Sequence, residues 1–208
     1  MTSYIILDSS NCELYLQKLL QIEYVVKSMS TDHAKIFSLL IDHLRKFIDQ
    51  QDSWGAVALF NDTVVAACCG QIQGCGKEHT CMYINCVINC SKTHRGEASR
   101  LIEFIFKTFG ADTFGFKLGN AAGLRGFNSY TRAAANCNLN TFAINYQTRQ
   151  VELAKNECLP TLFITKHSIT TIQSLLFPPP LFDHQHPMLP SKKSISRFNE
   201  LRKKWKKQ

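Results

Sequence analysis

The spacing of apolar residues predicts a strand, a tight turn and a helix in the middle of the chain. Residues 82–90 alternate with a period of two, which is typical of a strand. From residue 98 the apolar positions recur every three or four residues and share one helix face: Ala98, Leu101, Ile102, Ile105, Phe106 and Phe109. The turn between these two elements is Thr93-His94-Arg95-Gly96-Glu97-Ala98.

The same reasoning predicts the elements on either side of this unit. A strand is expected at 4–7, helices at 12–29 and 32–50, a β-hairpin at 54–60 and 63–69, and a glycine-containing loop at 70–79. After the central unit we expect a strand at 111–118, a helix at 121–135, a strand at 141–146 and one or two more strands at 151–154 and 160–166. The order βααβββαβαββ predicts a mixed α/β fold with helices on both faces of the sheet.

Proline content marks the end of the predicted domain. Five of the six prolines lie at 178, 179, 180, 187 and 190, which excludes a helix or a central strand there. We therefore predict a domain at 1–167, a Pro-rich linker at 168–193 and a tail at 194–208. The segment 176–182 resembles short proline-rich ligands of aromatic grooves, with packing back on the domain as the alternative.

The positive charge of the chain belongs to its tail. The net charge is +8, and residues 191–208 hold eight Lys or Arg and one Glu. An amphipathic helix at 194–207 would suit nucleic acid, an anionic membrane surface or an acidic protein. The alternative is a solvated or disordered basic end.

Composition favours a folded, non-membrane protein. The chain has 208 residues, of which 45% are hydrophobic, enough for a substantial core. Neither a bilayer-length apolar stretch nor a basic segment before a hydrophobic run is visible, so we expect a cytoplasmic location. The oligomeric state is not predicted.

The nine cysteines do not form a recognisable framework. Their number is odd and no Cys-x-x-Cys pair occurs, so neither a disulfide scaffold nor a zinc ribbon is indicated. The crowded stretch from Cys68 to Cys90 raises a zinc site as an alternative. Buried, reduced thiols that act as small hydrophobes are the preferred interpretation, and we expect no metal.

The turn at Gly96 has the chemistry of a phosphate site. A glycine allows close backbone approach, and the first N–H groups of a helix have no partner within the helix. Such a helix start attracts phosphate groups. The N–H groups of His94 to Ser99, with added charge from Lys92 and Arg95, are therefore candidates to bind phosphate.

This stretch resembles the acyl-CoA-binding element of the GNAT superfamily, the acyl-CoA-dependent N-acyltransferases, whose motif is Gln/Arg-x-x-Gly-x-Gly/Ala. Gly96 and Ala98 match its last two defined positions, whereas Thr93 departs from the first. The resemblance covers about residues 3–167 and implies a mostly antiparallel sheet and acetyl-CoA or another acyl-CoA as the acyl donor. It implies cofactor contacts at Ile88, Cys90, Thr93, His94, Arg95, Gly96, Glu97, Ala98, Ser99 and Asn120. Glu97 also suits the start of the helix, because acids in a first turn stabilise it.

The resemblance further implies a general acid on the helix after the fifth strand. Tyr130 is the nearest equivalent, about three residues further from Asn120 than is usual, and Phe127 at the usual spacing has no proton to give. Glu78 or His79, acting through a water molecule, is the preferred base. The resemblance also implies that strands 82–90 and 112–118 separate and leave a gap for the thioester.

Two functions from different classes follow. One is an N-acyltransferase, with an acceptor amine on a protein, an aminoacyl-RNA or a small molecule. The other is a non-catalytic, degenerate member of this fold that binds a partner through its Pro-rich linker and basic tail. Loss of CoA binding would separate the two.

Overall fold

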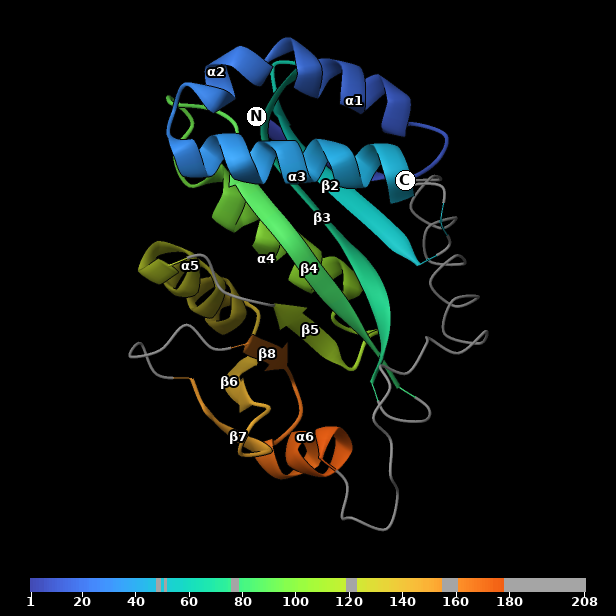
Figure 1. Cartoon of the computed structure of the whole chain (residues 1–208), viewed down its shortest axis with the longest axis vertical. Helices are drawn as coiled ribbons and strands as arrows, with labels where there is room; N and C mark the ends of the chain where they lie inside the picture. The colour runs from blue at the N-terminus through green and yellow to red at the C-terminus, as the bar shows by residue number, and fades with distance from the viewer. Residues whose placement is uncertain (48–49, 51, 76–78, 119–122, 155–160, 178–208) are drawn as a thin grey trace. The chain divides into compact units, whose positions relative to one another are not determined.

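The structure, a computed structural model, describes residues 1–47, 50, 52–75, 79–118, 123–154 and 161–177 (Figure 1). Its elements in chain order are β1 (Thr2–Leu7), α1 (Cys12–Gln21), α2 (Glu23–Lys27), α3 (Thr31–Phe47), β2 (Ser53–Phe60), β3 (Thr63–Cys75), β4 (His79–Asn89), α4 (Glu97–Phe109), β5 (Gly115–Leu118), α5 (Gly123–Asn136), β6 (Asn140–Asn145), β7 (Gln150–Leu153), β8 (Thr161–Thr165) and α6 (Ile169–Leu176). No helix within these ranges is both long and apolar enough to span a lipid bilayer.

The predicted fold class is confirmed. The eight strands form a mixed sheet in the order β1-β2-β3-β4-β5-β8-β6-β7. The pairs β1–β2, β2–β3, β5–β8, β6–β8 and β6–β7 are all antiparallel. The predicted succession of elements is also present, with the first helix divided in two and both of the optional last strands formed.

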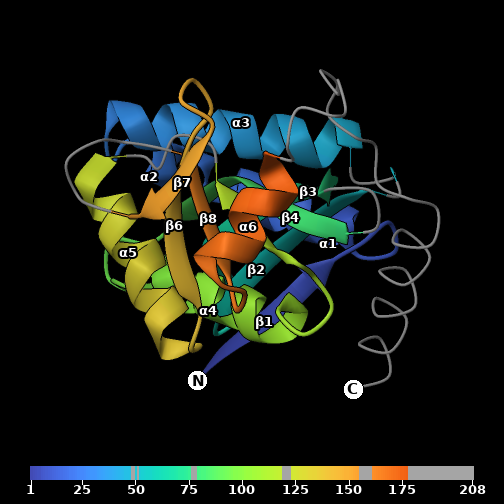
Figure 2. The same cartoon turned by 90° about the horizontal axis from the view of Figure 1, so that it is seen from below.

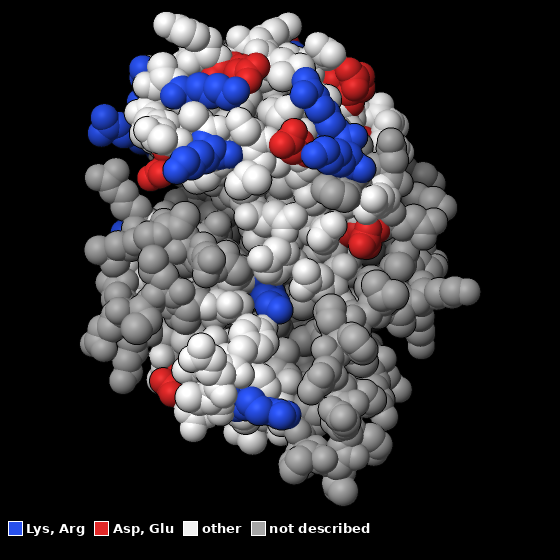
Figure 3. Space-filling view, viewed as in Figure 1, with Lys and Arg blue, Asp and Glu red and all other residues white. Residues whose placement is uncertain are grey.

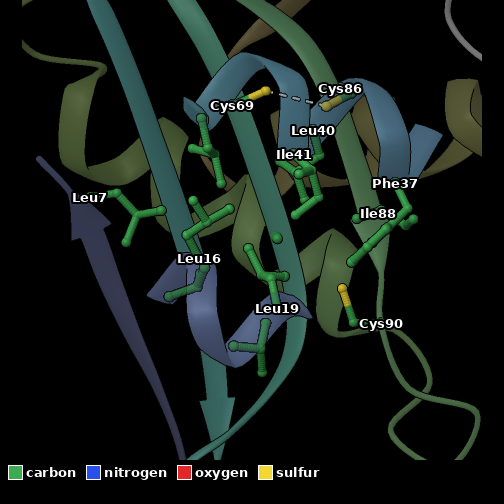
Figure 4. Packing of buried hydrophobic residues seen from close by; sticks show 14 of the residues in the cluster. Leu7, Leu16, Leu19, Phe37, Leu40, Ile41, Cys69, Cys86, Ile88 and Cys90 are labelled. Carbon is green, nitrogen blue, oxygen red and sulfur yellow. Dashed lines mark hydrogen bonds between the residues drawn. The ribbon is translucent and has the colours of Figure 1, made fainter. Parts of the chain in front are cut away.

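The chain divides into two compact units, which we describe separately. Of the described residues, unit 1 contains those within Met1–Gln71 and Ile84–Ile105, and unit 2 contains those within Ile72–Tyr83 and Phe106–Phe198. The core of unit 1 lies between α1, α2 and α3 and one face of its strands (Figure 4). Leu16, Leu19, Phe37 and Leu40 from the helices pack there against Ile88 and other strand residues.

Strand β1 separates two layers of unit 1, because its side chains alternate between its faces. Ile5 and Leu7 belong to the core beneath α1 and α3. Tyr4 points the other way and stacks on Phe104 of α4, with ring centroids 5.2 Å apart. Unit 1 therefore has helices on both faces of its strands.

The helix predicted at 12–29 is interrupted at Ile22. Helix α1 ends at Gln21 and α2 begins at Glu23, and the N–H of Ile22 donates to the carbonyl of Leu19 in a tighter turn. The β-branched residues Ile22, Val25 and Val26 lower helix propensity at this point, which accounts for the break.

The loop predicted at 70–79 is wrong. Strand β3 continues through Gly70 and Gly74 to Cys75, and β4 already begins at His79. The glycines suggested a loop, but sheet pairing on a long hairpin overrides this local preference. Residues 76–78 lie outside the described residues.

Unit 2 contains a helix that the sequence analysis did not predict. Helix α6 lies beside β6, β7 and β8 (Figure 2), and its Ile172 is fully buried against Phe142, Val151 and Phe163. Ser168 caps it by accepting the N–H of Thr171. This helix occupies the start of the predicted Pro-rich linker, whose proline-dense part and the predicted tail lie outside the described residues.

The described cysteines are free thiols, and most are buried. Figure 4 shows Cys69 and Cys86 facing each other, with their Sγ atoms 3.3 Å apart. This contact and burial raise the pKa of Cys69 well above its ordinary value, and burial raises the pKa of Cys90 to about 12. These thiols stay protonated and act as small hydrophobes. Within the described ranges no group of three His, Cys, Asp or Glu side chains is placed to bind a metal.

Candidate functional site

The turn between β4 and α4 depends on glycine. Gly96 has a φ angle of +86°, a conformation that side chains with a Cβ rarely adopt. A Cβ added there would meet no atom within 4 Å, so the space above the helix start is open. Glycine is required here by backbone conformation and not by crowding.

Ser91 closes the first half of the turn. Its Oγ accepts the N–H groups of Thr93 and His94 at 3.3 and 3.1 Å. His94 Nδ1 lies 3.1 Å from the hydroxyl oxygens of both Ser91 and Thr93, and its ring packs on Phe60 at 4.3 Å. The N–H groups of Thr93 and His94 are therefore already occupied, which shortens the run of donors predicted from His94.

The donors that follow are open. The first N–H of α4 with a helical partner is that of Arg100, which donates to the carbonyl of Gly96 at 3.1 Å. Among the described residues, the N–H groups of Arg95 to Ser99 have no hydrogen-bond partner. Five consecutive backbone donors at the start of a 13-residue helix form a site suited to an anion.

The Glu97 side chain faces inward, away from this open space. It is 3% exposed, accepts hydrogen bonds from Thr2 and Tyr4 of β1 at 3.4 and 3.3 Å, and pairs with Arg100. Its carboxylate thus attaches α4 to β1, while its backbone N–H remains in the donor run. A cofactor contact predicted at Glu97 could therefore be made by its backbone N–H group, because its side chain is turned toward β1.

At the end of β4, the backbone groups point alternately toward β3 and away from it. The N–H of Cys90 donates to the carbonyl of Val65 on β3 at 2.8 Å, and the side chains of Ile88 and Cys90 lie in the core. Backbone groups of successive strand residues point to opposite edges, so those of Val87 and Asn89 point away from β3. Asn89 Oδ1 is buried without a hydrogen-bond partner among the described residues.

Two cationic side chains lie at the turn. Lys92 and Arg95 are both exposed, and Lys92 Nζ reaches Ser28 Oγ at 3.4 Å. Neither forms an ion pair with a described acidic side chain. Both are free to add positive charge beside the open N–H groups.

The predicted catalytic residues lie in unit 2. Tyr130 is on α5 with a half-buried side chain, and His79 is exposed at the start of β4, where its ring packs on Phe114 at 4.7 Å. Glu78 and Asn120 lie outside the described residues. The turn belongs to unit 1, and the roles of the predicted acid and base stay predictions.

A buried histidine in unit 1 is accounted for by packing. His43 Nε2 lies 3.2 Å from the carbonyl of Gly70, which can only accept, so Nε2 carries the proton. Nδ1 then accepts from Asn85 Nδ2 at 3.1 Å. Burial lowers the pKa of His43, and with both nitrogens engaged it links α3 to β3 and β4 as a neutral side chain.

Sequence reasoning missed Ser91 and the surroundings of Lys117. A serine hydroxyl often accepts the backbone N–H groups two and three residues further along the chain. This motif, formed here by Ser91, could have been recognised in the sequence. Lys117, the single charge in the predominantly apolar β5, lies over the Tyr146 ring at 5.1 Å. The signal in the sequence was a lysine within an otherwise apolar strand, which indicates a cation that needs a specific environment.

No protein-family model and no curated protein matches the chain. Solved structures similar to it include an aminoglycoside acetyltransferase from an uncultured soil metagenomic sample, at 13% identity and TM-score 0.48 over 64% of this chain and 90% of that one. A ribosomal-protein-alanine N-acetyltransferase from Brucella melitensis biovar Abortus 2308 has 11% identity and TM-score 0.44, over 64% and 89% of the two chains. A predicted acetyltransferase with acetyl-CoA from Clostridium acetobutylicum has 13% identity and TM-score 0.43, over 64% and 88%. At such low identity and TM-score, these likenesses establish neither activity nor substrate.

Proposed function

We propose that the chain is an acyl-CoA-dependent N-acyltransferase of the GNAT superfamily, with acetyl-CoA as the expected donor. The observation that carries this proposal is the run of open N–H groups from Arg95 to Ser99, which begins in the glycine turn. A diphosphate has the charge and the acceptor oxygens that such a run of donors binds. Lys92 and Arg95 add charge at its rim.

The pantetheine arm would pair with the edge of β4 that faces away from β3. The Cys90 N–H is hydrogen-bonded to Val65, so we expect the arm to contact the backbone groups of Val87 and Asn89 and not those of Ile88 and Cys90. The buried Asn89 Oδ1 is a further acceptor for an amide N–H of the arm.

Acyl transfer needs three further actions. A base takes a proton from the acceptor amine, the amine nitrogen bonds to the thioester carbonyl carbon, and the carbon–sulfur bond breaks as an acid protonates the sulfur. Tyr130 is the proposed acid, and His79 or Glu78 the proposed base. The acceptor is an amine on a small molecule, a protein or an aminoacyl-RNA.

Calorimetric titration of acetyl-CoA and CoA into the full chain tests the cofactor site. We expect saturable binding of both, since the donor run recognises the diphosphate that they share. A well-folded chain that binds neither would contradict the proposal.

Two variants of Gly96, Gly96→Asn and Gly96→Asp, provide the matched control, because their new side chains have nearly the same size and shape. Asn and Asp tolerate a positive φ better than other residues and place a side chain in the same open space. Gly96→Asn should weaken CoA binding, and Gly96→Asp should weaken it by about a further tenfold or more, because its charge repels the diphosphate. Equal affinities of the two variants would show that no anion binds there.

A non-catalytic binding module is the second candidate, and one observation favours it. Ser91 occupies two N–H groups of the turn, at Thr93 and His94, which leaves fewer donors than the full predicted site. In that case the Pro-rich linker and the basic tail would contact the partner, and CoA would not bind.

A further inference from the structure

Charge is distributed unevenly between the two units. The described part of unit 1 has eight Lys or Arg and nine Asp or Glu, and Figure 3 shows both signs interspersed over its helices. The described part of unit 2 has six Lys or Arg and only two Asp or Glu. Unit 2 therefore has an excess of positive charge in the part that the structure describes.

Lys117 is the cation of unit 2 whose surroundings are best defined. It lies on β5 opposite Phe163 of β8, with its side chain partly buried. Burial lowers the pKa of Lys117, but the nearby Tyr146, Cys81 and Tyr83 outweigh this effect, and the net shift of the pKa is upward. The ammonium group therefore stays charged at neutral pH.

This charge has no carboxylate partner within the described ranges. No Asp or Glu side chain there forms an ion pair with Lys117. A partly buried charge is usually paired, because removing it from water is costly. The Tyr146 ring, whose centroid lies 5.1 Å from Lys117 Nζ, does not neutralise the charge.

A second cation lies on the same group of aromatic rings. Tyr146 meets Phe177 edge to face at 5.9 Å, and the guanidinium of Arg149 lies 5.9 Å from the Phe177 ring. Gln173 of α6 donates to the Arg149 carbonyl at 2.8 Å and fixes the turn that carries both Tyr146 and Arg149. Two cations, Lys117 and Arg149, are thus held at the two ends of one aromatic pair.

We propose that Lys117 and Tyr146 bind the acidic group of a small anionic ligand. This inference rests on the proposed function in one respect. If the chain is an acyltransferase, the ligand is its acceptor, an amine that carries a carboxylate or a phosphate. Lys117, whose Nζ lies 5.1 Å from the Tyr146 ring centroid, would donate a charge-assisted hydrogen bond to the anion, and the Tyr146 hydroxyl would donate its own proton to it. Tyr146 is 48% exposed, so the pair is open to solvent.

Binding can be measured without activity, by NMR of the ¹⁵N-labelled full chain. The probes are 4-aminobutyrate and phosphoethanolamine, with butylamine and ethanolamine as the analogues that lack the acidic group. We expect saturable shifts of the amides of β5 and of the turn at 146–149 with the two acidic amines only. Their relative affinities distinguish carboxylate from phosphate.

Lys166→Gln is the matched control for Lys117→Gln, because it removes the same charge from an exposed position in the same unit. Lys117→Gln should weaken binding of the acidic amines by about tenfold or more, and Lys166→Gln by less than about twofold. Equal weakening by both, or no saturable shift with either acidic amine, would overturn the inference. Binding that follows these expectations in a chain that binds neither acetyl-CoA nor CoA would support the anion site and contradict only the acyltransferase proposal.

Discussion

At the scale of single residues, the Tyr4–Glu97 contact attaches α4 to β1. The Tyr4 hydroxyl donates to a carboxylate that is 3% exposed, so Tyr4→Phe should lower the free energy of unfolding by about 1 kcal/mol. Urea denaturation measures this change. Tyr24→Phe is the control, because Tyr24 is 86% exposed on α2 and should change stability little.

The same pair of variants has a pH dependence with a defined sign. Burial, followed by Glu97, raises the pKa of folded Tyr4 above 10.0. The unfolded chain then loses the phenol proton first, so the stabilisation by Tyr4 is complete below pH 10 and declines above it. The stability difference between the wild type and Tyr4→Phe should therefore shrink in alkali, and a constant difference would contradict this account.

At the scale of elements, α6 should be part of the folded structure of unit 2. Ile172 is fully buried and Ile169, one turn earlier, is 37% exposed. We expect Ile172→Ala to cost about 2–4 kcal/mol in the free energy of unfolding and Ile169→Ala less than about 1 kcal/mol. Thermal denaturation of the two variants tests this, and similar losses would show that α6 does not pack as described.

The elements that the sequence predicted well are those with regular spacing. Strand β4 and helix α4 follow from alternation up to Cys90 and from helical periodicity after Ala98. Helix α6 was missed because Ile169–Leu176 is short and precedes prolines, and its only clear signal was the Ser168 cap. Long-range sheet pairing, which no local pattern contains, extended β3 beyond Gly70.

The candidate site was predictable only in part, for a related reason. Gly96 could be identified from its place between a strand and a helix, and its positive φ agrees with that prediction. That Glu97 faces β1 and that the Cys90 N–H is bonded to Val65 depend on contacts between distant segments. Such contacts decide which groups remain open for a ligand.

At the scale of the whole molecule, the predicted basic tail should matter only for large acceptors. Residues 191–208 carry eight Lys or Arg and could raise the local concentration of an anionic macromolecule. Deleting them should leave acetylation of a small free amine unchanged and weaken that of a macromolecular acceptor. The measurement is CoA release with each acceptor, and equal losses would refute a tethering role.

The positive φ at Gly96 also has a genetic consequence. A single base change in a glycine codon leads to Ala, Val, Ser, Cys, Arg, Trp, Asp or Glu, and never to Asn. Asp is the one of these that tolerates the left-handed backbone best, and it brings a negative charge to a helix start that would bind phosphate. Every replacement of Gly96 by a single base change therefore strains the turn or repels the ligand. We expect single-base substitutions of this glycine to be poorly tolerated.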